Sequence, residues 1–371
     1  MRILHTADWQ IGRRYPFFEE ADGALLAESR FTMVERLRDL ARAESVDLMV
    51  VAGDVFDAQT VDERSLRRVF RALADFSCPC CLLPGNHDAA LAESVWTRAQ
   101  RLNLVPETVA LLLVPEPRHF HDLGVSILPA PLTQRHTLRD ATEDFASMES
   151  PPGFFRIGVA HGAVTSVLAD GADANNPINP NCVEQAHLDY LALGDWHGTR
   201  EISPRAWYSG TPEPDRFTNN LRGQVLMVEI AAPGELPVVR PIAVAQYRWQ
   251  EWRHEFRVAE DVERLQERLA PLGAQDVIRL HLSGTLDLAA QRRLDEVLAE
   301  VRARLRVLDL ADPQVRLQAS DADIAELRVD GYLTEVVQEL RQRSAHPEEG
   351  AFASEALGIL ATLLQESEGT R

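Results

Sequence analysis

Short apolar runs alternate with amphipathic segments through residues 1–230 of the chain. The segments "RFTMVERLRDLARAE" and "DERSLRRVFRALADF" repeat apolar residues every three or four positions, which predicts helices. Continuous apolar runs predict strands that are covered on both faces. These runs are "RILHTAD", "VDLMVVAGD", "PCCLLPGNHD", "VSILPA", "FRIGVAHG", "YLALGDWHG" and "QVLMVEI". The alternation predicts a layered α/β fold.

The pattern changes near residue 243. Strand-like "AQYRWQEWRHEFRV", "DVIRLHLSG" and "QVRLQAS" are separated by helical "DVERLQERLA" and "LAAQRRLDEVLAEVRARL". This β-α-β-α-β order predicts a small two-layer α+β domain. We therefore expect three regions, 1–242, 243–320 and 321–371.

Two helical patterns remain in region 321–371, "YLTEVVQEL" and "FASEALGILATLL". Each has one apolar stripe, which either packs on its own protein or docks on a partner. The stripe of the second comprises Phe352, Ala356, Ile359, Leu360, Leu363 and Leu364.

The composition is that of a globular protein, with 45% hydrophobic and 26% charged residues. The start "MRILHTADWQ" is unlike a secretory signal, and no apolar run reaches the length of a membrane span. We therefore expect a cytoplasmic protein. Its cysteines are Cys78, Cys80, Cys81 and Cys182, and "CPCC" lacks zinc-site spacing. Buried, reduced thiols are the expectation.

The net charge of -19 argues against a broad basic surface for nucleic acid. It does not exclude a protein that holds phosphates locally through metal ions. All 38 basic residues are Arg, a residue suited to bidentate phosphate contacts, although a general compositional bias explains this more simply.

Five short segments combine Asp, Asn, Gln or His with the end of an apolar run. They are "HTADWQIG", "GDVFD", "GNHD", "AHG" and "GDWHG". A single such segment would be an ordinary turn. Five together predict that strand ends converge on a metal site of carboxylates, amides and imidazoles. Such an oxygen-rich set suits Mn²⁺, Mg²⁺ or iron.

The pattern "GD…GNHD…H…GDWH" resembles the calcineurin-like metallophosphoesterases, which hold two metals on a two-sheet α/β sandwich. Within that family, "HTADWQIGRR", "AGDVFD" and "WYSGTPEPDRF" resemble the SbcD nuclease subunits, which work with the ATPase SbcC. The resemblance covers residues 1–230 and extends more loosely to 243–320 as a capping domain. It implies that the terminal helices engage the coiled coil of an SbcC-like ATPase.

The resemblance also implies a ligand set, with Asp54 as the carboxylate that bridges two divalent ions. The first ion would take Asp8, Gln10 and His197, and the second Asn86, His161 and Asp195.

Four further residues are candidates for catalysis or for binding the substrate. His87 would donate a proton or stabilise the transition state, and Asp88 would orient it. Arg13 and Arg14 could reach a phosphate backbone.

Two ligand positions depart from the family pattern, because Gln10 and Asp195 stand where histidines are expected. A carboxylate binds Mn²⁺ or Mg²⁺ well, whereas an amide oxygen binds weakly. The first site is therefore expected to be loose, to fill with substrate or to stay empty. The extra negative charge of Asp195 predicts a preference for harder ions than zinc.

We expect a two-metal phosphodiesterase that acts on DNA as an exonuclease or endonuclease in repair and recombination. The alternatives are a non-cutting scaffold for the ATPase and DNA ends, and a small-molecule phosphodiesterase. The resemblance also makes a homodimer plausible. His5 is expected to be a core residue or one that supports the metal ligands. Trp9 and Trp196 are expected to serve packing, and "YSGTPEPDRF" is expected to form a structural turn at the rim of the site.

Overall fold

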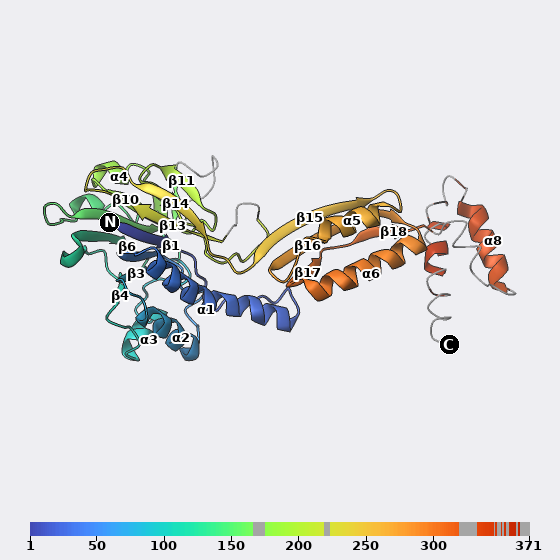
Figure 1. Ribbon diagram of the computed structural model, residues 1–371, viewed down its shortest axis with the longest axis horizontal. Helices are drawn as coiled ribbons and strands as arrows, with labels where there is room; N and C mark the ends of the chain where they lie inside the picture. The colour runs from blue at the N-terminus through green and yellow to red at the C-terminus, as the bar shows by residue number, and fades with distance from the viewer. Residues whose placement is uncertain are drawn as a thin grey trace. The chain divides into compact units, whose positions relative to one another are not determined.

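The computed structural model describes residues 1–165, 175–218, 223–318 and 332–344, together with 346, 350, 352–353, 356–360 and 363. The chain divides into two compact units, Met1–Arg248 and Trp249–Arg371 (Figure 1). No helix in the described ranges combines the length and apolarity that crossing a bilayer requires.

The first unit contains two six-stranded sheets. The first sheet has the order β14-β13-β1-β2-β3-β4, in which β1, β2, β3 and β4 are parallel neighbours. Its strands are β1 (Arg2–Thr6), β2 (Leu48–Ala52), β3 (Cys80–Leu83), β4 (Val109–Leu111), β13 (Gln224–Glu229) and β14 (Val238–Ala243).

The second sheet has the order β11-β12-β10-β7-β6-β5, in which β12, β10, β7 and β6 are parallel neighbours. Its strands are β5 (Arg118–Phe120), β6 (Val125–Ala130), β7 (Phe155–His161), β10 (Tyr190–Gly194), β11 (Arg200–Ser203) and β12 (Ala206–Tyr208). A separate pair consists of β8 (Ala163–Val164) and β9 (Pro177–Ile178).

Helices cover the outer face of each sheet. The helices α1 (Glu20–Ala43), α2 (Glu63–Ala74) and α3 (Val95–Arg101) share one apolar core with the first sheet (Figure 1). The short helix α4 (Cys182–Gln185) and the 3₁₀ turn η2 (Phe145–Ser147) pack on the second, and a further turn, η1 (His121–Leu123), follows β5.

Consecutive residues of the central strands enter different cores, which explains their continuous apolar runs. Leu4 packs under the helices, whereas Ile3 lies in the core between the two sheets. Alternate residues of a strand point to opposite faces, so both faces must be apolar. The structure confirms the predicted two-sheet α/β sandwich. It also confirms that all four cysteines are buried and free.

The second unit contains a four-stranded sheet, on which two helices pack, and a further helix toward the C-terminus. Its elements are β15 (Arg248–Phe256), α5 (Asp261–Leu269), β16 (Asp276–Leu286), α6 (Leu288–Arg304), β17 (Val307–Leu310) and β18 (Gln314–Leu317). The strand β17 was not predicted from the sequence. Ile278, Leu280 and Leu282 face the helices, while intervening residues of β16 are partly exposed.

Toward the C-terminus, the helix α8 (Tyr332–Ser344) includes the predicted helical segment "YLTEVVQEL" and continues past it. Its buried Val337 packs with Leu357. Leu364, the last member of the predicted terminal stripe, lies outside the described residues.

A buried polar contact joins the two sheets at His5 on β1. Its Nε2 lies 3.2 Å from the carbonyl of Leu193, and its Nδ1 lies 2.9 Å from the hydroxyl of Tyr190. A carbonyl can only accept, so Nε2 carries the hydrogen and the Tyr190 hydroxyl donates to Nδ1. Burial lowers the pKa of His5 to about 3, although the Leu193 carbonyl opposes this shift. The prediction that His5 serves the core agrees with these contacts.

We predict that His5→Gln makes the free energy of unfolding depend less steeply on pH between about 3 and 6.5. The folded-state pKa of His5 is about 3, below its ordinary value of 6.5, so unfolding takes up a proton between these two pH values. Stability due to neutral His5 is therefore present above pH 6.5 and lost as the pH falls toward 3, by up to about 1.4 kcal/mol per pH unit. Urea unfolding at several pH values should give a shallower dependence for His5→Gln. An unchanged slope would contradict this, and His136→Gln, at an exposed position, is the control.

Candidate metal centre

Five strand ends from the two sheets meet at one place in the first unit. Asp8 and Gln10 follow β1, Asp54 follows β2, and Asn86 follows β3. In the second sheet His161 ends β7, whereas Asp195 and His197 follow β10. The loops after β1 and β2 are held side by side, because the backbone N–H groups of Asp8 and Gln10 donate to the carbonyls of Gly53 and Asp54, each at 3.0 Å.

Asp8, Asp54 and His161 form the centre of the cluster. One side-chain atom from each lies within 4.8 Å of the other two, and all three residues are buried. His161 Nδ1 lies 2.9 Å from the carbonyl of Ala52 and must donate to it. This bond directs Nε2 toward the carboxylates, at 3.6 Å from Asp54 Oδ1 and 3.7 Å from Asp195 Oδ1. A histidine oriented in this way is the arrangement found around bound metals.

The other implied ligands lie around this centre. Asn86 Oδ1 is 2.9 Å from His161 Nε2, and His197 Nε2 is 3.9 Å from Asp8 Oδ1. Gln10 Nε2 donates to Asp54 Oδ2 at 2.9 Å, and the backbone N–H of Asp195 lies 3.2 and 3.3 Å from the two oxygens of Asp8. The structure thus gathers all seven implied ligands in one cluster. Their role as ligands stays a prediction.

Four of these residues have left-handed backbone conformations. The φ angles are 55° at Asp8, 50° at Gln10, 54° at Asp54 and 95° at Asp195. Such conformations cost on the order of 1–3 kcal/mol each and persist where the surrounding structure enforces them, often at functional sites. The chain turns sharply after each strand and aims these side chains inward.

Glycines next to these positions allow the strand ends to approach. A Cβ on Gly53 would lie 2.1 Å from His161 Nδ1, and one on Gly194 would lie 1.8 Å from the Ala52 carbonyl oxygen. A Cβ on Gly85 would lie 2.2 Å from Asp54 Oδ1. Only glycine fits at these contacts, which explains the glycine in "GDVFD", "GNHD" and "GDWHG".

The cluster concentrates negative charge away from water. Burial raises the pKa of Asp8 to about 6, and Asp54 and Asp195 add to this rise, while His197 and His161 oppose it. Burial disfavours a charged His161, but Asp54, Asp195 and Asp8 outweigh this effect and raise its pKa to about 9. Gln10 Oε1 is buried and has no hydrogen-bond partner. Buried carboxylates beside an unpaired amide oxygen fit a divalent cation.

A family comparison accounts for this arrangement. The family model described as calcineurin-like phosphoesterase matches residues 1–198 of the chain. The chain belongs to the calcineurin-like phosphoesterases. These enzymes are metallophosphoesterases, and the described cluster of Asp8, Asp54 and His161 lies within the matched residues.

The chain is similar to two bacterial proteins, of which one is named only as a metallophosphoesterase and the other as a nuclease subunit. The uncharacterized metallophosphoesterase YhaO of Bacillus subtilis is 27% identical over 229 residues, which cover 57% of this chain and 53% of YhaO. The D subunit of the nuclease SbcCD of Escherichia coli K12 is 26% identical over 287 residues, which cover 66% of this chain and 70% of that relative. The chain therefore spans about half the length of YhaO and somewhat more of the nuclease polypeptide.

Two solved structures were also matched. TT1561 of Thermus thermophilus is 12% identical, with a TM-score of 0.41, over 66% of this chain and 98% of that chain. The purple acid phosphatase PPD1 from yellow lupin is 12% identical, with a TM-score of 0.40, over 67% of this chain and 54% of that chain.

In this phosphoesterase the surroundings of His87 differ from the prediction. His87 Nδ1 lies 2.8 Å from the carbonyl of Asp57, which fixes the hydrogen on Nδ1 and leaves Nε2 3.9 Å from Asp54 Oδ2. The carboxylate of Asp88 instead accepts from the backbone N–H groups of Phe56 and Gly85, at 3.0 and 2.7 Å. The expectation that Asp88 orients His87 is therefore wrong. Asp88 holds the two loops together.

Asp88 is also fully buried. Its burial and the nearby Asp54 raise its pKa to about 8, although the N–H groups of Phe56 and Gly85 oppose the rise.

The two arginines expected at the substrate have different surroundings. Arg13 Nη1 is 3.2 Å from Asp57 Oδ1, and its Nη2 is 3.3 Å from Asp215 Oδ2. Its charge is thus already paired within the protein. Arg14 is exposed. Of the two, Arg14 is the better placed for a phosphate, and this role stays a prediction.

Asp215 is a residue of the site that the sequence reasoning missed. Its fully buried side chain lies 3.2 Å from His197 Nδ1. Burial acts to raise the pKa of Asp215, but His197, Arg30 and Arg13 outweigh it and hold the pKa well below its usual range. Asp215 thus holds the His197 ring so that its Nε2 faces Asp8.

The same segment holds a second contact to the site. Thr211 donates its hydroxyl to the carbonyl of Asp8 at 2.8 Å. The only signal in the sequence was the segment "YSGTPEPDRF", which was expected to be a structural turn.

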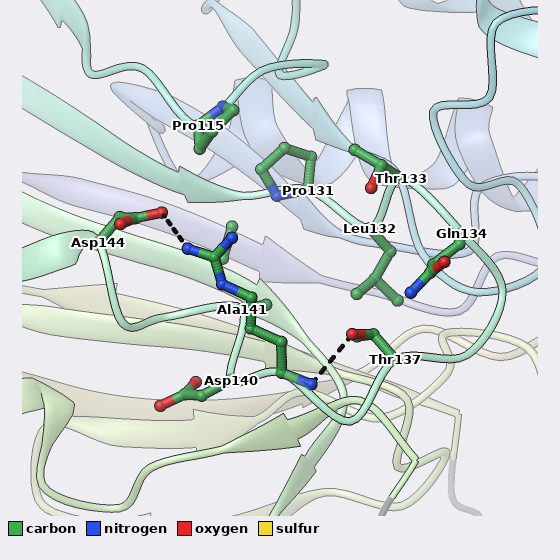
Figure 2. A pocket seen from close by; sticks show the side chains of 11 residues that line it. Pro115, Pro131, Leu132, Thr133, Gln134, Thr137, Asp140, Ala141 and Asp144 are labelled. Atoms are coloured by element: carbon green, nitrogen blue, oxygen red, sulfur yellow. Dashed lines mark hydrogen bonds and ion pairs between the residues drawn. The ribbon is translucent and has the colours of Figure 1, made fainter.

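A cavity of about 180 Å³ lies apart from the predicted site residues. Figure 2 shows its lining, which includes Pro115, Pro131, Leu132 and Asp144. Arg139 at this cavity pairs with Glu143 and Asp144, so its positive charge is already balanced. The lining thus offers no unbalanced cation for a phosphate.

Arg30 connects the two loops that hold Asp8 and Asp215. This arginine of α1 is fully buried, and its Nη1 donates to the carbonyl of Trp9 at 2.7 Å. Its Nη2 donates to the carbonyl of Glu213 at 3.1 Å, and its Nε donates to the hydroxyl of Tyr15 at 2.8 Å. One planar guanidinium therefore fixes the segment between Asp8 and Gln10 relative to the segment before Asp215.

We predict that Arg30→Lys weakens Mn²⁺ binding by about 10–100-fold, the usual effect of losing a group that orients metal ligands. A lysine keeps the charge but cannot satisfy both carbonyls with the same fork geometry. Isothermal titration with Mn²⁺ measures the affinity, and thermal unfolding shows that the variant is folded. The control is Arg68→Lys on α2, because the half-exposed Arg68 pairs with Glu28 of α1 at the surface. Equal Mn²⁺ affinity in both variants would contradict the positioning role.

Proposed function

We propose that this phosphoesterase is a metal-dependent DNA phosphodiesterase that processes DNA ends together with an SbcC-like coiled-coil ATPase. The observation that carries the proposal is the cluster of Asp8, Asp54 and His161, with Asn86 and His87 beside it. Relatives named as the D subunit of the nuclease SbcCD support DNA as the substrate. A role in repair or recombination and a cytoplasmic location belong to this proposal.

In this mechanism the carboxylates and imidazoles of the cluster would hold two divalent ions, with Mn²⁺ the expected metal. When bound, such ions act as Lewis acids and lower the pKa of water. Asp54 would be the ligand common to both sets, because its Oδ2 lies 2.9 Å from Gln10 Nε2 and its Oδ1 lies 3.6 Å from His161 Nε2. The protein's fixed ligands set the position of the phosphodiester, so little reorganisation is required during the reaction.

His87 would deliver a proton to the leaving oxygen of the phosphodiester. The carbonyl of Asp57 holds the hydrogen on Nδ1, so Nε2 is the atom that exchanges protons. The side chain of His87 is 29% exposed, in contrast to the fully buried His161, and is accessible to a substrate. This exposure fits a residue that contacts DNA instead of one that only holds a metal.

A partner protein would explain how a chain with a net charge of -19 binds DNA, which is also negatively charged. The metals supply positive charge locally, whereas a long DNA strand requires a wider basic surface. We propose that the ATPase supplies it. Apolar residues near the C-terminus offer a docking surface, because Tyr332, Phe352, Ile359 and Leu363 are each more than half exposed. A homodimer, which the resemblance also implies, stays a prediction.

We predict that His87→Ala lowers cleavage of single-stranded and hairpin DNA in Mn²⁺ by about 100-fold or more, the contribution of a general acid. Hydrolysis of bis-p-nitrophenyl phosphate should fall much less, because p-nitrophenolate leaves without a proton. Both rates are measured on purified protein. Asp54→Asn is the matched control and should lose both activities.

Three outcomes separate the proposal from its alternatives. Cleavage of DNA that depends on His87 supports the nuclease. Hydrolysis of the small ester without DNA cleavage, with and without the ATPase, supports a small-molecule phosphodiesterase. Binding of DNA ends and ATPase with neither activity supports a scaffold. Either of the last two results would overturn the nuclease proposal.

We predict that Asp195→His shifts the metal preference from manganese toward zinc. The substitution removes one negative charge and adds a nitrogen ligand, and zinc accepts nitrogen more readily than the hard ions do. Competition titrations should show the ratio of zinc to manganese affinity rising by about tenfold or more. Asp195→Asn removes the charge without adding an imidazole and serves as the control. An unchanged ratio in Asp195→His would contradict the hypothesis.

A further inference from the structure

Trp196 lies between two residues of the metal centre, yet it is not buried. Asp195 and His197 flank it in the chain, so its Cα is about 3.8 Å from theirs. It is 42% exposed, whereas Trp9, which lies between Asp8 and Gln10, is 0% exposed. The expectation of packing agrees with the structure for Trp9 and is wrong for Trp196. An exposed indole between two residues of the metal centre in the chain is available to a ligand.

The backbone explains why the two tryptophans differ. Asp195 has a φ of 95°, and its N–H is directed to the carboxylate of Asp8. With both neighbours turned toward the cluster, Trp196 is left on the outer side of the loop. Trp9 instead donates its indole N–H to Thr6 within the protein, at 3.0 Å.

Positive charge accompanies the exposed ring. The guanidinium of Arg200, the first residue of β11, lies over the Trp196 ring at 5.5 Å from its centroid. Arg216 also lies close by: its side chain is 55% exposed, but its Nε pairs with Asp215 Oδ1 at 3.2 Å, so Arg200 is the arginine that the ring can use. Proteins that bind single-stranded nucleic acids commonly combine an aromatic ring with an arginine in this way. The ring stacks a base, and the guanidinium contacts the base or the backbone.

We propose that Trp196, with Arg200, is a stacking platform for an unpaired nucleobase next to the scissile phosphodiester. This inference rests on the proposed function and deepens it, because it assigns the substrate as a single-stranded segment. A base in a duplex keeps both faces stacked on its neighbours, whereas an unpaired base can place one face on the indole. The platform would hold the DNA strand so that its phosphodiester lies at the metal centre. Binding of the strand would then depend on the presence of a base.

The test compares the binding of two short DNA single strands in Mn²⁺. Both have phosphorothioate linkages to resist cleavage, and in one strand abasic sites replace the nucleotides. Fluorescence anisotropy of the labelled strands gives the two Kd values. The wild-type protein should bind the strand with bases at least about fivefold more tightly, the lower bound for one stacked base. Trp196→Ala should reduce this ratio to about one, and Trp196→Phe should restore most of it.

The control variant is Leu236→Ala, which removes another exposed apolar side chain of the first unit. It should keep the wild-type ratio. A wild-type ratio near one, a Trp196→Ala ratio equal to that of wild type, or no measurable binding of either strand would each overturn the proposal. The readout is a binding ratio, so it is separate from cleavage. A protein that shows the base preference but cuts no DNA would retain the platform while the nuclease proposal fails.

Discussion

The burial of carboxylates against one imidazole, where the two sheets meet, is the constraint on which the first unit depends. Asp8 and Asp54 are almost inaccessible to water, and their charges face His161 from the opposite sheet. An uncompensated buried charge is strongly unfavourable, so the two sheets must keep their registers for the cluster to be stable. The hydrogen bond from His161 Nδ1 to the Ala52 carbonyl connects the end of β7 in the second sheet to the end of β2 in the first. A bound cation would supply the compensation that the protein's own groups only partly provide.

A second layer of contacts holds the loops that carry these groups. Arg30 joins the segment around Trp9 to the segment before Asp215, and Asp215 in turn holds His197. Glu213 extends this layer. Its carboxylate pairs with Arg36 and accepts the N–H groups of Gln246 and Tyr247, just before the boundary between the two units. The end of the first unit is therefore fastened to the same segment that supports the metal centre.

The centre combines rigid, buried groups with accessible ones, and this division matches their different tasks. His161 and Asp8 are enclosed, whereas His87 and Asp195 are about one-third exposed and Trp196 is more so. Groups that hold cations gain from a low dielectric, while groups that contact a large substrate must reach the surface. The glycines and left-handed residues after the strands make this arrangement possible, because they bring backbones close and turn side chains sharply.

The sequence by itself determined the layered α/β class, the central strands and the ligand candidates. Strands buried on both faces require continuous apolar runs, and turns at their carboxyl ends require glycine, Asp and Asn. It did not reveal edge strands such as β14 and β17, which carry a weaker apolar signal because they are less buried. Only the tertiary structure decided that Asp57, and not Asp88, orients His87, that Asp215 and Arg30 support the site, and that Trp196 is exposed. These facts depend on contacts between residues far apart in the chain, such as Arg30 and Pro214, which are separated by 184 positions, and no local pattern specifies a partner at that distance.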